Sequence, residues 1–105
     1  MRIIYAEEKL TKAVEVLATG SGRVKERLRN AAASLVCLRP DGFPDGDLRR
    51  TFVGVIDDLT YQQGGENEGS ISATLKITDD KDARAIARRI IDLHHAVRRH
   101  ILDQS

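Results

Sequence analysis

The sequence predicts an all-α fold of four or five helices, packed as a compact bundle-like or orthogonal array. Aliphatic residues recur at helical spacing in four separate segments. Aromatic residues make up only 4% and tryptophan is absent, so the core must come from Leu, Ile, Val and Ala, which suits packed helices better than a β-sandwich. With 105 residues the chain is near the usual size of one domain, and we expect residues 1–105 to form a single helical domain.

An aliphatic stripe predicts the first helix over about residues 5–19. Its members recur on one face of a helix: Leu10, Val14 and Leu17, with Ala6 and Ala13 beside them. Gly20 is expected to end this helix, because glycine readily adopts the backbone conformations found just beyond a helix C-terminus. Ser21 is then expected to cap a second helix.

The second helix is expected to continue to the region before Pro40, because proline cannot continue a helix. Its stripe comprises Val24, Leu28, Ala31, Leu35 and Leu38. The following segment, R-P-D-G-F-P-D-G-D, contains two turn signals, and Asp47 is expected to cap a third helix. The apolar residues of this third helix are Leu48, Phe52, Val55, Ile56 and Leu59.

Residues 61–69 (Y-Q-Q-G-G-E-N-E-G) are polar and rich in glycine, and predict a flexible loop. Residues 70–78 admit two interpretations. Alternation of apolar and polar residues fits a strand, whereas Ser70 as N-cap and the pair Ile71 and Leu75 fit a helix. We favour a short helix, because a lone strand would leave its backbone groups unpaired in a helical chain.

The last helix is expected to be the longest, with Thr78 or Asp79 as its cap. Seven acidic residues lie within residues 57–82, whereas residues 83–105 contain five arginines and two acids. Aspartates in the first turn and arginines in the last turns match the helix dipole. The helix dipole therefore explains part of this acidic-then-basic order without a bound ligand.

All three histidines lie in I-A-R-R-I-I-D-L-H-H-A-V-R-R-H, residues 86–100. On a helical wheel His94 falls on the apolar arc, so we expect it to be buried, neutral and hydrogen-bonded to a neighbouring helix. A separate basic stripe is predicted to face solvent and forms the candidate interaction face: Arg84, Arg88, His95 and Arg99.

Arg89 and His94 match R-x4-H, the pattern of the helical HEPN ribonucleases, in which an arginine and a histidine act on the RNA phosphate and ribose hydroxyl. On one helix the two side chains would point about 140° apart, and arginine-rich helices produce this spacing by chance. We therefore assign no catalytic residue, and an RNA-cleaving enzyme is the third of three function hypotheses.

No metal site or cofactor is expected. Adjacent histidines such as His94 and His95 diverge on a helix, and no second cysteine is available as a ligand. The glycines of A-T-G-S-G-R-V-K complete no phosphate-binding motif. Cys37 lies beside the stripe of the second helix and is expected to be a small buried hydrophobe.

A lone cysteine is typical of a reducing compartment, so we expect the protein to be cytoplasmic. No apolar run is long enough for a membrane span, and no secretory signal is recognised. The net charge of +1 gives no general attraction for nucleic acid, and no aromatic residue interrupts the basic stripe to stack on bases.

Three segments resemble those of a group of short, uncharacterised bacterial proteins: L-A-T-G-S-G-R-V-K-E-R-L, the F-P-D turn before a helix ending in L-T, and E-G-S-I-S-A-T-L followed by A-R-R-I-I-D-L-H. The resemblance implies a small helical domain and supplies no catalytic residue, cofactor or substrate. The function expected from the sequence is a non-enzymatic protein-interaction module or accessory subunit, with a protein partner or self-association. Weak nucleic-acid binding through the last helix is the alternative.

Overall fold

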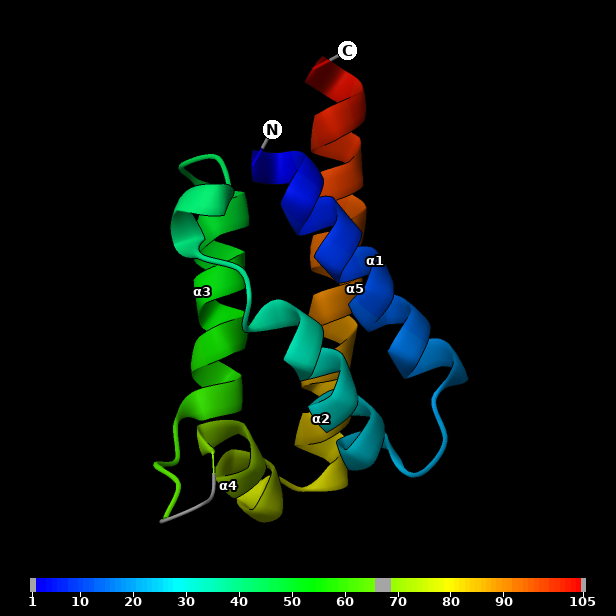
Figure 1. Ribbon diagram of the computed structural model, residues 1–105, viewed down its shortest axis with the longest axis vertical. Helices are drawn as coiled ribbons and strands as arrows, with labels where there is room; N and C mark the ends of the chain where they lie inside the picture. The colour runs from blue at the N-terminus through cyan, green and yellow to red at the C-terminus, as the bar shows by residue number, and fades with distance from the viewer. Residues whose placement is uncertain (1, 66–68, 105) are drawn as a thin grey trace.

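The computed structural model describes residues 2–65 and 69–104 and shows, within them, an all-α fold (Figure 1). Its elements are α1 (Arg2–Thr19), α2 (Val24–Leu35), a short 3-10 turn η1 (Pro40–Gly42), α3 (Asp47–Thr60), α4 (Ser70–Ile77) and α5 (Asp80–Gln104). The prediction of four or five helices is confirmed. The first helix begins earlier than the predicted residue 5.

The longest helix, α5, packs against α1, α2 and α3. In addition α1 packs on α2, and α3 packs on α4, whereas α2 and α3 make little direct contact with each other. Figure 1 shows α3 at one edge of the molecule, on the opposite side from α1. None of the helices in the described part of the chain has the length and hydrophobicity that crossing a bilayer requires.

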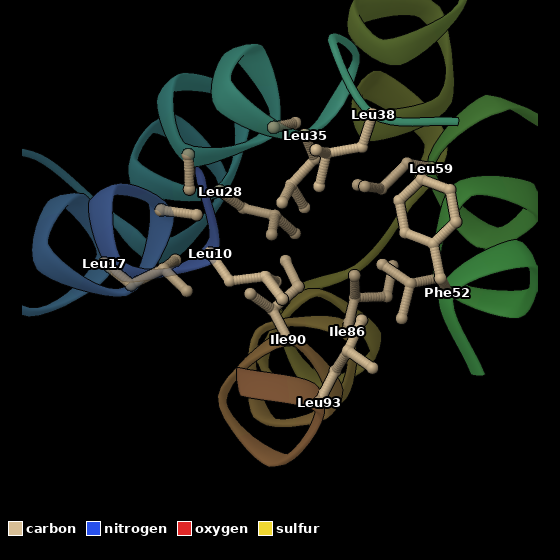
Figure 2. Close-up of a cluster of buried hydrophobic side chains, with 14 of the residues drawn as sticks. Leu10, Leu17, Leu28, Leu35, Leu38, Phe52, Leu59, Ile86, Ile90 and Leu93 are labelled. Atoms are coloured by element: carbon tan, nitrogen blue, oxygen red, sulfur yellow. The ribbon is translucent and has the colours of Figure 1, made fainter. Parts of the chain in front are cut away.

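The predicted aliphatic stripes meet in one hydrophobic core (Figure 2). Each helix from α1 to α3 contributes one face, and α5 contributes a long arc opposite them. The buried residues from these stripes are Leu10 and Leu17 of α1, Leu28 and Leu35 of α2, Phe52, Val55 and Leu59 of α3, and Ile86, Ile90, Leu93 and Val97 of α5. Burial of each such aliphatic side chain stabilises the fold by about 1.5 to 3 kcal/mol, so this cluster holds the helices together.

The loop between α1 and α2 differs from the prediction that Ser21 caps α2. The N-cap position belongs to Arg23, which has an extended backbone and makes no side-chain capping bond. Gly22 adopts a φ of 92°, a conformation that glycine tolerates best, and this lengthens the loop before α2 begins. Arg27 Nη1 then donates a hydrogen bond to the carbonyl oxygen of Leu17 at 2.9 Å. A side chain of α2 therefore provides a partner for one of the backbone carbonyls that the C-terminus of α1 leaves unpaired.

The second helix also ends earlier than predicted, at Leu35 rather than just before Pro40. Proline restricts the residue before it to extended backbone, and Arg39 has φ −122° and ψ 153°. Leu38 is buried although it lies outside the helix. Cys37 is exposed, so the prediction that it is a buried hydrophobe is wrong, because the chain leaves the helical path before reaching it.

The turn before α3 is stabilised by a ring contact and by hydrogen bonds, both made at Phe43. Phe43 is buried and stacks on Phe52, with ring centroids 4.5 Å apart. Arg49 donates to the carbonyl oxygen of Phe43 from Nε at 3.2 Å and from Nη2 at 2.9 Å. Gly46, with a φ of 122°, takes the N-cap position, so Asp47 is the first helical residue and not the cap that we predicted.

In the predicted loop at residues 61–69, residues 61–65 and 69 contain no helix or strand, and residues 66–68 lie outside the described residues. Residues 70–77 form α4, so the helical interpretation of this segment is confirmed and the strand interpretation is wrong. The N-cap of α4 is Gly69 rather than Ser70.

The junction between α4 and α5 agrees with the sequence. Asp79 Oδ1 accepts a hydrogen bond from the backbone N–H of Asp82 at 2.7 Å, which is the geometry of an N-cap. The carbonyl oxygen of Thr78 accepts a hydrogen bond from Lys25 Nζ at 2.9 Å. A lysine of α2 is therefore hydrogen-bonded to the backbone just before the start of α5.

Candidate functional site

The basic stripe predicted on the last helix lies on the outer face of α5, where Arg84, Arg88, His95 and Arg99 are all exposed. Arg88 Nε lies 3.3 Å from Asp92 Oδ1, in a pair whose side chains are mostly open to solvent. Such exposed pairs contribute about 0 to 1 kcal/mol. The stripe is available for contact with a partner.

His94 lies on the opposite side of α5 and is buried, with 8% of its surface exposed. Its Nε2 is 3.0 Å from Oγ1 of Thr11 on α1. The Thr11 hydroxyl lies 2.9 Å from the Glu7 carbonyl oxygen and 3.1 Å from Glu7 Oε1. Since a hydroxyl has one proton, its donation to Glu7 leaves the Thr11 oxygen to accept the Nε2–H of His94. The expected hydrogen bond to a neighbouring helix is therefore present.

The pKa of His94 is lowered from its ordinary value of 6.5, chiefly because burial removes water from the charged form. The positive charge of Arg98 and the neighbouring His95 lower it further, whereas the carboxylate of Glu7 opposes the shift. The rings of His94 and His95 are 6.1 Å apart. His94 is consequently neutral at pH values near 7.

The chain of contacts from His94 through Thr11 to Glu7 has residue types found in nucleophilic sites, but its setting does not suit that chemistry. Thr11 lies in the middle of α1, where backbone N–H groups donate to carbonyls one turn earlier. None of these amides can stabilise an oxyanion beside the hydroxyl. The contacts serve to join α1 to α5.

Arg89 reaches in another direction and forms an ion pair with Asp58 of α3. Gly54 makes room for it, because a Cβ at that position would lie 2.7 Å from Arg89 Nη2. His94 contacts α1 and Arg89 contacts α3, so within one chain the two residues of the R-x4-H pattern are engaged with different helices.

A hollow that the sequence did not predict lies between α3 and residues 36–40, the segment that follows α2. We call it the α2–α3 groove; it has a volume of about 300 Å³ and is lined by Val36, Leu38, Pro40, Phe52, Val53, Ile56 and Asp57. Val36 is 56% exposed and Val53 is 36% exposed, whereas Leu38 and Phe52 are buried. The only ionisable side chain in the lining is Asp57, which is exposed.

A second hollow adjoins the groove at Val36, so the apolar surface continues along α2. Its lining includes Ala33 of α2, Thr60 of α3 and Ile71 of α4. The second hollow lies where α2, α3 and α4 meet, and α2 and α3 make little direct contact there. The only signal for them in the sequence is that Val36 and Val53 are apolar yet lie outside the stripes that form the core.

Among residues 2–65 and 69–104, no group of three or more His, Cys, Asp and Glu side chains is placed to hold a metal ion. No family model, curated protein or solved structure matches the chain.

The buried position of His94 leads to a prediction about stability. His94→Ala should lower the free energy of unfolding by about 1 to 3 kcal/mol, because it leaves a cavity and removes the partner of Thr11. His95→Ala, at the exposed neighbouring position, is the matched control and should change it by less than about 0.5 kcal/mol. Urea denaturation followed by circular dichroism measures both, and equal effects at the two positions would contradict the assignment.

The lowered pKa of His94 leads to a second prediction. As the pH falls through 6.5, the unfolded chain takes up a proton at this residue before the folded chain does. The contribution to stability is therefore complete above that pH and is lost below it. NMR titration of the imidazole should give a pKa for His94 below 6.5, and a value above 6.5 would show that Glu7 outweighs burial.

Proposed function

We propose that this protein is a non-enzymatic interaction module whose α2–α3 groove receives aliphatic side chains from a partner helix. The observation that carries the proposal is the groove itself, with a lining that is apolar except for Asp57. Recognition of an amphipathic helix in a groove depends on a few aliphatic anchors that enter between two helices. Here the two walls are α3 and residues 36–40, and Val36 and Val53 present exposed aliphatic surface to such an anchor.

The energetics favour a partner that covers the groove. Val36 and Val53 both have solvent-accessible aliphatic surface beside the buried side chains of Leu38 and Phe52. Removal of apolar surface from water contributes about 25 cal/mol per Å². Leu38 and Phe52 are already packed in the core, and an incoming side chain would need little rearrangement of the groove.

The two residues of the R-x4-H pattern support a module rather than an enzyme, because each is engaged in a contact between helices. His94 bonds to Thr11 of α1, and Arg89 pairs with Asp58 of α3. We place the interaction in the cytoplasm of a bacterium, on the basis of the single cysteine and the resemblance to short bacterial proteins.

The proposal predicts that Val36→Asp abolishes the interaction while the fold is retained, because a carboxylate would be placed inside an apolar contact. Ile77→Asp is the matched control, since Ile77 is 59% exposed on α4 and lies outside the groove lining. The measurement is a quantitative pull-down from the native host with tagged wild type and both variants, followed by binding assays with the purified captured protein.

A protein, or an untagged copy of this chain, that is retained by wild type and by Ile77→Asp but lost with Val36→Asp supports the proposal. Equal capture by all three baits would refute it, and so would a purified pair whose affinity is the same with and without Val36→Asp. Circular dichroism of each variant confirms that a loss of binding is not a loss of folding.

A second candidate function, nucleic-acid binding, is favoured by the three exposed arginines of the α5 stripe, Arg84, Arg88 and Arg99. It ranks lower because the net charge is +1 and no aromatic residue is interleaved with the stripe to stack on bases. We predict at most weak binding of RNA or DNA that falls steeply with salt. Fluorescence anisotropy with labelled oligonucleotides measures it. Affinity tighter than about 1 μM at physiological salt, abolished by Arg88→Ala with Arg99→Ala, would reverse the ranking.

A further inference from the structure

We infer that the helix received by the α2–α3 groove is α3 of a second copy of this chain, in a two-fold symmetric dimer with the two α3 helices antiparallel. The inference rests on the proposed function, because it specifies the partner of the same groove. It follows from how charged and apolar residues are placed along the exposed side of α3.

Arg50, Val53 and Asp57 lie on that side of α3, three and four residues apart, so they follow one another along a narrow strip. The Arg50 side chain is 73% exposed, and Asp57 is exposed at the edge of the groove. Arg50 and Asp57 are two helical turns apart, about 10 Å, with Val53 between them. From Arg50 to Asp57 the strip is basic at one end, apolar in the middle and acidic at the other, and the exposed Asp47 lies one turn before Arg50 and pairs with it.

This order of charges is complementary to itself in one orientation. If the two-fold axis passes close to Val53 and the helices are antiparallel, Arg50 of each copy faces Asp57 of the other. A parallel pair would instead place Arg50 against Arg50 and Asp57 against Asp57, which repel one another. The charges therefore select the antiparallel arrangement, which gives the closed, isologous contact typical of two-fold dimers.

The same arrangement covers the apolar surface. Val53 lies in the middle of the strip and also lines the groove, so the two-fold axis places Val53 of each copy beside the groove of the other. Arg50 already pairs with Asp47 in its own helix, but both side chains are largely exposed. Such a surface pair contributes about 0 to 1 kcal/mol and can exchange for a pair between copies.

The expected strength follows from the size of the contact. One helix and one groove from each copy form an interface at the small end of the specific range, below about 1,200 Å² in total. Contacts of this size are typically weak, so we expect a reversible dimer that forms in the micromolar range and above.

The test is sedimentation equilibrium of the full chain under reducing conditions, which prevent disulfides at the exposed Cys37. The variants are Arg50→Asp, Asp57→Arg and the two together. Each single variant should raise the dimer dissociation constant about tenfold or more, because it places like charges together at both ends of the contact. The double variant should return it to within about threefold of wild type, since the charges are exchanged but still complementary.

Arg84→Asp, on the exposed face of α5, is the matched control for reversal of an arginine and should leave the dissociation constant unchanged. A wild-type chain that stays monomeric up to about 1 mM, well above the range expected for specific association, would overturn the inference. So would a dimer that is insensitive to both single variants, or a double variant that stays as weak as either single one.

These outcomes are separable from those of the proposed function. If the chain is monomeric but loses a different captured protein on Val36→Asp, the groove is an interaction site and its occupant is not a second copy. If the dimer shows the exchange of charges and is weakened by Val36→Asp, both proposals are supported. If neither self-association nor capture depends on Val36, both fail.

Discussion

Burial of the aliphatic arc of α5 is the constraint on which the rest of the structure depends. Ile86, Ile90, Leu93 and Val97 face the core, and α1, α2 and α3 all pack against this one helix. Because the three helices share a single support, α2 and α3 make little contact with each other, and the chain that joins them forms the groove with α3. The edges of the arc carry the polar links, with His94 bonded to α1 and Arg89 paired with α3.

Most of the fold could be predicted from the sequence, because helical spacing of aliphatic residues identifies which face of each helix is buried. Leu10, Leu28 and Ile90 are in the core as their spacing indicates. The errors are at helix ends. Gly22 and Gly46 adopt positive φ and shift the starts of α2 and α3, which depends on loop conformation and not on periodicity.

The candidate surfaces were predictable only in part. The helical wheel separates the buried His94 from the exposed His95, since both lie on one regular helix. The groove was not predicted, because Val36 follows the end of α2 and Val53 lies in α3, and helical periodicity does not show that the two come together. A single apolar residue outside the buried stripes is a weak signal by itself, and only the three-dimensional arrangement joins two such residues.

The pairing of Arg89 with Asp58 above Gly54 adds little to the stability of α3. Glycine within a helix costs about 1 kcal/mol relative to alanine. A half-exposed ion pair contributes about that much or less, so the two effects nearly cancel. The guanidinium lies against the bare backbone at Gly54, where an added Cβ would be 2.7 Å from Nη2, so a side chain there would displace Arg89 from Asp58. The rotation of α3 follows instead from burial of Phe52, Val55 and Leu59, and the same rotation leaves Val53 exposed beside the groove.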